Sequence, residues 1–205
     1  MATATLTAPA SATSHLMSVD EFWDFCQLPE NQGQSYELIR GKVVPMCRPT
    51  HPHGFACGNI ARFVGNYSFE TSDGYVTTND SGVVLFEDPA TVVGPDVAFY
   101  RGVRTREDVP KKWGDKVPVL AVEVLSPTDR FSRVQTKIDD YLESGVALVW
   151  LADPEEMSIM VYRPGSRGQL FPANSTLSGG AELPGFSVRV GDLFRYAFEG
   201  RPSAP

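Results

Sequence analysis

Two almost entirely apolar segments constrain most strongly what this chain can fold into. Residues 117–125 read "VPVLAVEVL" and residues 146–154 read "VALVWLADP". Strands that are apolar on both faces are typical of parallel sheets, which are buried between layers of helices. Neighbouring parallel strands need a long crossover, usually a helix, between them. The two segments therefore predict a β-α-β unit and an α/β fold.

The segment that connects them has the pattern of an amphipathic helix. It reads "TDRFSRVQTKIDDYLESG" over residues 128–145, with Thr128 or Asp129 as the expected N-cap and Gly145 as the end. Its apolar residues recur at helical spacing on one face: Val134, Ile138, Tyr141 and Leu142. We expect this face to cover the sheet.

The rest of the chain predicts further short elements around this unit. Ser18 and Glu21 form a capping box, "SYELIRGKVVPM" predicts a hairpin, and residues 54–67 have helical spacing. Strands are predicted in "GYVTTND", "GVVLFED", "VVGPDVAFY" and "MSIMVYRPG", and hairpins and loops in the Gly-rich residues 164–194. We expect one domain over residues 16–198, a disordered lead-in over 1–15 and a flexible tail over 199–205.

Charge and cysteine content argue against several classes of protein. The formal net charge is −7, so the surface as a whole repels nucleic acid and anionic membranes, and a phosphate must be bound at a local site. We find neither a signal sequence nor an apolar stretch of the roughly 20 residues that span a membrane. Three cysteines without a CxxC pair argue against a disulfide framework and a cysteine-based zinc site. We expect a cytoplasmic protein.

Glu123 is an anomaly within the first apolar segment. An ionised carboxylate among apolar neighbours costs several kcal/mol unless it is paired or binds a metal. The structural alternative is a strand-end carboxylate that reaches water or pairs with an arginine. Either way, the sequence predicts that something compensates this charge.

Two more residues could share a site with Glu123. Asp96 follows Pro95 at the edge of an apolar strand, and two converging carboxylates suit Mg²⁺; Pro-Asp is also common in turns. Lys137 lies at the edge of the apolar face of the predicted helix, from which it can point toward the sheet. The alternative for Lys137 is a side chain whose stem lies on apolar surface and whose ammonium reaches water.

The sequence resembles a known family on five motifs. They are "YELIRGKVV", "GPDVAFY", "AVEVLSPTDR", "KIDDYLESGV" and "VWLADP". In this order they resemble the Uma-type family of restriction endonuclease-like proteins, in the PD-(D/E)XK nuclease superfamily, from about Ser18 to about Phe194. The resemblance implies a restriction-endonuclease-like core, a central mixed β-sheet flanked by α-helices.

The resemblance also implies the composition of a metal site. Asp96 and Glu123, with the carbonyl of Val124, would bind Mg²⁺ or Mn²⁺. The superfamily places a lysine two residues after the acidic residue, but Leu125 stands there, so the role of that lysine passes to Lys137 on the following helix.

Four further positions were considered for this site. Glu37 matches a family glutamate and could line the same site, or it could be an exposed hairpin residue. His53 matches a family histidine, and we expect it to be a cap or surface residue. Gln135 and Ser126 could contact substrate or water.

These residues predict a metal-dependent endonuclease that hydrolyses phosphodiester bonds of nucleic acid, with DNA as the expected substrate and a homodimer as the expected state. The most basic segment, residues 101–116, is either a phosphate-contacting lip or a solvated loop. Two alternatives remain open. One is a catalytically silent, nuclease-like scaffold that binds a metal or a partner protein. The other is a glycosidase that uses Glu37 and Glu123 as its acid/base pair.

Overall fold

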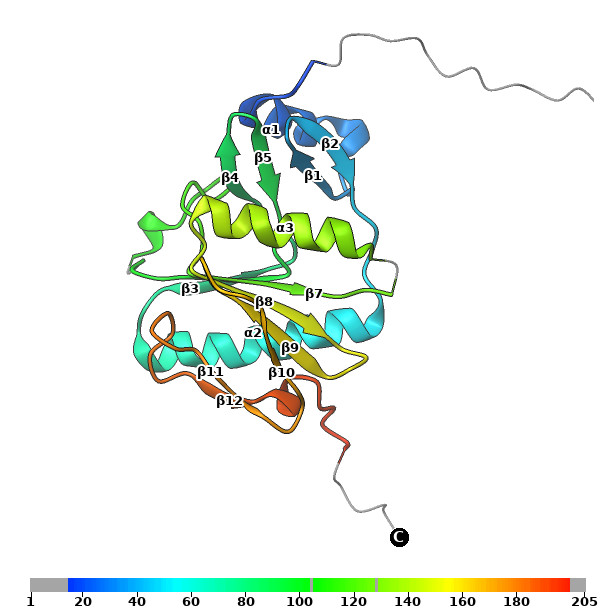
Figure 1. Ribbon diagram of the computed structural model, residues 1–205. Helices are drawn as coiled ribbons and strands as arrows, with labels where there is room; N and C mark the ends of the chain where they lie inside the picture. The colour runs from blue at the N-terminus through cyan, green and yellow to red at the C-terminus, as the bar shows by residue number, and fades with distance from the viewer. Residues whose placement is uncertain (1–14, 104, 128, 200–205) are drawn as a thin grey trace, which may run out of the picture.

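The β-α-β unit expected from the two apolar segments lies at the centre of the structure (Figure 1). In this computed structural model, which describes residues 15–103, 105–127 and 129–199, β7 (Leu120–Val124) and β8 (Leu148–Asp153) are paired in parallel. They are joined by α3 (Phe131–Ser144). The prediction of an α/β fold is confirmed.

The central sheet has six strands in the order β10-β9-β8-β7-β6-β3. Only the β7–β8 pair is parallel among these neighbours, so the sheet is mixed, as expected. The remaining strands are β3 (Tyr75–Thr78), β6 (Val97–Tyr100), β9 (Ser158–Tyr162) and β10 (Gln169–Phe171).

A second, smaller sheet has the order β2-β1-β5-β4, and α1 (Val19–Gln27) packs against it. Its strands are β1 (Tyr36–Ile39), β2 (Lys42–Pro45), β4 (Val83–Glu87) and β5 (Ala90–Val93).

The C-terminal part forms the hairpin of β11 (Thr176–Ser178) and β12 (Ser187–Arg189). Short 3-10 turns are η1 (Pro29–Asn31), η2 (Arg106–Asp108) and η3 (Val190–Leu193).

Helices cover the two faces of the central sheet (Figure 1). α3 lies between the central sheet and the small sheet, and α2 (His51–Thr71) lies on the opposite face. Side chains alternate along β7: Val122 and Val124 belong to the core beneath α2, and Ala121 belongs to the core beneath α3. Glu123 therefore faces α3.

Several local predictions are confirmed. Ser18 and Glu21 form the capping box of α1. The β1–β2 hairpin turns at Arg40 and Gly41, which both have positive φ, 49° and 75°. Gly41 also lies so close to Leu16 that a Cβ there would be 2.6 Å from the Cβ of Leu16, so glycine meets two requirements at this turn.

The starts of α2 and α3 differ from the prediction. α2 begins at His51, earlier than the predicted 54, with a proline in its first turn, which is a helix-start signal. Asp129 does not cap α3, because its Oδ2 accepts the N–H of Ser126 in the preceding turn. The N-cap is Arg130, without a side-chain hydrogen bond, and Thr128 is outside the described residues.

The predicted lead-in and tail also lie outside the described residues, apart from His15 and Glu199. His15 contacts the carboxylate of Glu21. Within the part of the chain that the structure describes, none of the helices combines the length and the apolar character needed to cross a membrane.

Candidate functional site

Glu123 is compensated by two side chains of α3. Its Oε2 accepts a hydrogen bond from Lys137 Nζ at 2.9 Å, and its Oε1 accepts one from the hydroxyl of Tyr141 at 2.6 Å. Burial raises the pKa of Glu123 to about 7, against the opposing influence of the nearby Lys137 ammonium. The carboxylate that stood out in the sequence is thus paired inside the protein.

Lys137 joins Glu123 to a second carboxylate. Its Nζ lies 2.9 Å from Glu37 Oε1 and 3.4 Å from the carbonyl oxygen of Gly94. Burial disfavours the ammonium, but the carboxylates of Glu123 and Glu37 outweigh it and raise the pKa of Lys137 above its ordinary value. The lysine points toward the sheet, so the alternative of an ammonium that reaches into water is wrong.

Glu37 comes from β1 of the small sheet and is only 3% exposed. The alternative of an exposed hairpin glutamate is therefore wrong. Its Oε1 also accepts the N–H of Gly94 at 3.3 Å. Glycine is required at position 94, because a Cβ there would lie 2.5 Å from the carbonyl oxygen of Asp80. We call Glu37, Glu123, Lys137 and Tyr141 the lysine cluster.

Asp96 lies beside Glu123, as expected for two neighbouring strands. β6 pairs with β7 in antiparallel register, with Val97 opposite Val122, so the next pair along is Asp96 and Glu123. Residues opposite one another have Cβ atoms about 5 Å apart. The charge of Asp96 is one of the causes that raise the pKa of Glu123.

The carboxylate of Asp96 is bound from the α2 side. Its Oδ2 accepts the N–H of Val124 at 2.7 Å and lies 3.3 Å from His53 Nε2. The hydrogen bond that the His53 ring donates to Asp96 raises the pKa of His53 above its ordinary value, although burial opposes this. His53 is 9% exposed, so the expectation of a cap or surface histidine is wrong: α2 begins before it and buries its ring against the sheet.

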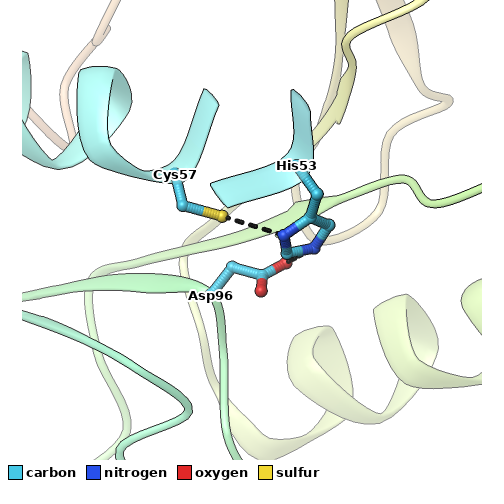
Figure 2. A group of neighbouring side chains, drawn as sticks. All are labelled: His53, Cys57 and Asp96. Atoms are coloured by element: carbon cyan, nitrogen blue, oxygen red, sulfur yellow. Dashed lines mark hydrogen bonds and ion pairs between the residues drawn. The ribbon is translucent and has the colours of Figure 1, made fainter. Parts of the chain in front are cut away.

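Cys57 completes a second group of side chains (Figure 2). It lies one turn after His53 on α2, with its Sγ 3.4 Å from His53 Nδ1. Possible ligand atoms of His53, Cys57 and Asp96 all lie within 4.8 Å of one another. Burial, reinforced by the negative charge of Asp96, raises the pKa of the Cys57 thiol above its ordinary value. We call these three residues the histidine cluster.

A cavity of about 550 Å³ borders the histidine cluster. Its wall includes His53 and Ser126, together with Leu125, Phe131 and Met160. It lies where the loop after β7 meets the start of α2 and the end of β8. The lining is mainly apolar, and Phe131 is 81% exposed, so the cavity can take a flat or apolar group close to His53.

The other predicted contacts are placed as follows. Gln135 donates a hydrogen bond to Asp139 on the outer side of α3. Ser126 donates its backbone N–H to Asp129 and lines the cavity. Val124 gives its N–H to Asp96, and the use of its carbonyl as a ligand stays a prediction.

The basic segment over residues 101–116 leaves β6 and enters β7 at the ends remote from Asp96 and Glu123. Part of it returns to the small sheet, where Trp113 packs against Phe22. Trp113 and Glu37 line a separate cavity of about 200 Å³. The contacts in the described part of this segment give no support to a lip at the mouth of the larger cavity, and they favour a packed surface loop.

Tyr141 and Cys57 belong to the two clusters but were not predicted as site residues. The sequence placed both on apolar helix faces, which is correct. The overlooked signal for Tyr141 is that a buried tyrosine hydroxyl usually finds a hydrogen-bond partner. The signal for Cys57 is its i, i+4 spacing from His53, which the late predicted start of α2 concealed.

The oxygen ligands at the start of β6 and the end of β7 suit a hard divalent cation. Asp96 and Glu123 offer carboxylate oxygens, which Mg²⁺ and Mn²⁺ prefer. Both oxygens of Glu123 already accept hydrogen bonds, but each retains a further lone pair. The residues therefore fit the metal that the resemblance implies.

The mixed sheet, the covering helices and the acidic residues at the strand ends define a restriction-endonuclease-like α/β protein. The family model Uma2, described as "Putative restriction endonuclease", matches residues 22–191. The chain belongs to this family. The description of the family supports a nuclease.

One solved structure illustrates the fold. It is the crystal structure of "a putative nuclease belonging to DUF820" from Anabaena variabilis, with a TM-score of 0.72 and 20% sequence identity. The match covers 87% of this chain and 97% of the other. At this identity the similarity shows the fold alone. A comparison with curated proteins gave no match.

Proposed function

We propose that the protein is a metal-dependent nuclease that hydrolyses phosphodiester bonds of nucleic acid, with DNA as the substrate. The observation that carries this proposal is the contact between Lys137 Nζ and Glu123, beside Asp96 on the neighbouring strand. A lysine from a helix thereby reaches the acidic residue that, in the superfamily, lies two residues from a lysine on the same strand.

The roles follow from position and charge. Asp96 and Glu123, with the carbonyl of Val124, hold Mg²⁺ or Mn²⁺, which when bound polarises the phosphate and lowers the pKa of a bound water. Lys137 positions the attacking water and offsets negative charge that develops on the phosphate. Glu37 keeps the Lys137 ammonium charged and directed at the site.

An acidic protein needs a local phosphate contact. Arg133 lies one turn before Lys137 on α3, and its side chain is 54% exposed, with its Nη2 3.7 Å from Glu37. We assign it a contact with a phosphate next to the scissile bond. Because few phosphates are contacted in this way, binding should depend only weakly on salt compared with that of strongly basic nucleases.

Two wider proposals accompany this function. The protein acts in the cytoplasm, and it forms a homodimer when it cuts both strands of a duplex. Light scattering of the purified chain, with and without a short DNA duplex, measures the second.

The test is a cleavage assay on single- and double-stranded DNA and RNA with Mg²⁺ or Mn²⁺. Glu123→Gln and Lys137→Gln should each reduce the rate by at least about 100-fold, whereas the exposed Glu156→Gln should keep wild-type activity. Circular dichroism at the assay temperature verifies that each variant is folded. Equal activity in all four proteins would assign the cleavage to a contaminant or another site.

One observation favours a second candidate function, a catalytically silent scaffold. Both carboxylate oxygens of Glu123 already accept hydrogen bonds, from Lys137 and Tyr141, and its pKa of about 7 leaves it partly protonated near neutral pH. A folded wild-type protein that cleaves none of the four substrates with either ion would favour the scaffold. The glycosidase alternative finds no support, because Lys137 occupies the space between Glu37 and Glu123.

A further inference from the structure

We propose that the histidine cluster is a second type of metal site, which binds a borderline-soft divalent cation such as Zn²⁺ through His53, Cys57 and Asp96. The proposal adds a second ion to the proposed nuclease, with Asp96 as a ligand of both ions. It rests on the proposed function only in placing Asp96 in an active site. Its test measures binding and does not depend on cleavage.

The spacing of His53 and Cys57 along α2 suits a metal site. His53 and Cys57 are four residues apart on α2, so they lie on one face of the helix, as do the two histidines of zinc-binding helices with an i, i+4 pair. Asp96 approaches from the start of β6. The three side chains point toward one another (Figure 2).

The distances between the possible ligand atoms also suit zinc. Zinc–nitrogen and zinc–sulfur bonds of about 2.0 and 2.3 Å place tetrahedral ligand atoms about 3.4–3.6 Å apart. The His53–Cys57 and His53–Asp96 contacts are 3.4 and 3.3 Å, although they use different ring nitrogens. All three ligand atoms lie within 4.8 Å of one another, so a contraction of about 1 Å by side-chain rotation completes the set.

The chemical nature of the three ligands favours zinc over magnesium. Thiolate and imidazole favour Zn²⁺ over Mg²⁺, which prefers oxygen ligands alone. A single cysteine in a mixed set does not need the CxxC spacing whose absence argued against a cysteine-based site. The raised pKa of the free thiol means that metal binding would release a proton, as is usual for thiolate ligands.

The surroundings of the histidine cluster also resemble those of a metal site. The side chains of His53 and Asp96 are 10% and 13% exposed, and the N–H of Val124 fixes the orientation of the Asp96 carboxylate, as outer-shell hydrogen bonds do in metal sites. His53 also lines the 550 Å³ cavity. A water or a substrate atom can therefore reach the fourth ligand position, which is the arrangement of a catalytic zinc site.

The experiment is a titration of the chelator-stripped, reduced full-length chain with Co²⁺, followed by competition with Zn²⁺ in excess Mg²⁺. Wild type should bind one Co²⁺, with visible bands of tetrahedral geometry and a near-ultraviolet thiolate-to-metal band. Cys57→Ser should lose the thiolate band and weaken zinc binding by more than about 100-fold, beyond the usual loss for an outer-shell partner. Cys47→Ser is the matched control, because Cys47 is exposed, and it should keep both.

His53→Gln is the second variant. It removes a ligand while leaving the thiol in place, so zinc binding should weaken although the thiol still reacts with a thiol reagent. Thermal unfolding verifies that both variants are folded.

A wild-type chain that binds Co²⁺ without a thiolate band, or binds Zn²⁺ no more tightly than Cys57→Ser, overturns the proposal. A chain that binds zinc as expected but cleaves no nucleic acid overturns the proposed nuclease and leaves this site in place.

Discussion

Two clusters of opposite character lie next to each other where Asp96, at the start of β6, stands opposite Glu123, near the end of β7. The lysine cluster on the α3 face combines two carboxylates with one ammonium and one hydroxyl, which compensate one another. The histidine cluster on the α2 face has a carboxylate, an imidazole and a thiol, with no permanent cation among them. The first contains a cation of its own, whereas the second has the composition of a site that gains stability from a bound cation.

Glu123 and Lys137 can form one site from different elements, β7 and α3, because the small sheet covers them. The chain passes from the small sheet to the central sheet between β5 and β6, and Gly94 in this passage contacts both Glu37 and Lys137. The small sheet thus closes over α3 and buries the lysine. Burial makes each charge of the lysine cluster dependent on its partners.

The largest effect should come from removing the only ammonium of the lysine cluster. Lys137→Met leaves the buried Glu123 without a cation, and Glu37 keeps only the half-exposed Arg133, 3.7 Å away. We expect a loss of about 3–5 kcal/mol in the free energy of unfolding at pH 8. The loss should be smaller at pH 5, where the carboxylates can take up protons. Urea unfolding at both pH values measures this, with the exposed Lys111→Met as control. A loss below about 1 kcal/mol at pH 8 would contradict the proposed dependence.

The next effect is a dependence of stability on pH. The pKa of Glu123 is raised from 4.5 to about 7 in the folded protein, so the folded state binds the proton more tightly. The resulting stability is complete below pH 4.5 and is lost as the pH rises to about 7, by about 3–4 kcal/mol at 1.4 kcal/mol per pKa unit. Glu123→Gln should lack this slope in chelator-treated protein, and Glu156→Gln should retain it. A wild-type slope in Glu123→Gln would assign the titration to another group.

A smaller effect should follow from the loss of one hydrogen bond in the lysine cluster. Tyr141→Phe removes the 2.6 Å bond to Glu123, and we expect a loss of about 2 kcal/mol, as for hydrogen bonds to charged groups. Because that bond favours the ionised carboxylate, the pKa of Glu123 should rise further. Denaturant unfolding and a pH titration monitored by carboxyl NMR measure the two effects. Tyr162→Phe, on a partly exposed residue, should leave both unchanged.

The smallest effect is expected in the histidine cluster. The pKa of His53 is raised by its hydrogen bond to Asp96, so its contribution to stability is complete below pH 6.5 and is lost as the pH rises through the folded-state pKa. With chelator present, His53→Gln should cost about 1 kcal/mol at pH 5.5 and less at pH 8.5. His51→Gln, at the exposed start of the same helix, is the control. If the loss of stability caused by His53→Gln grew with pH, the pKa of His53 would be lowered in the folded protein, which contradicts the prediction.

The fold was largely predictable because its signals are local. The apolar runs of β7 and β8 and the amphipathic pattern of α3 are complete within their own segments. The helix starts were less predictable, since they depend on which backbone N–H groups find partners. At α2, the proline in the first turn was the better signal than the later helical spacing, and placing the start too late concealed the pairing of His53 with Cys57.

Some members of the candidate site could be predicted, but their contacts could not. Glu123, Asp96 and Lys137 could be selected because each conflicts with its apolar surroundings or lies at their edge. The burial of Glu37 could not be predicted, because a hairpin glutamate is exposed unless another layer covers it. Here that layer is α3, on which the small sheet packs.

The sequence by itself determined that a β-α-β unit forms and that the carboxylate of Glu123 needs compensation, since both follow from the free energy of burying apolar or charged groups within one segment. Only the tertiary structure decided what compensates it. Lys137, Tyr141 and Glu37 come from different elements, and their distances depend on how the two sheets pack around α3. The same packing turned Asp96 toward α2, where it joins His53 and Cys57.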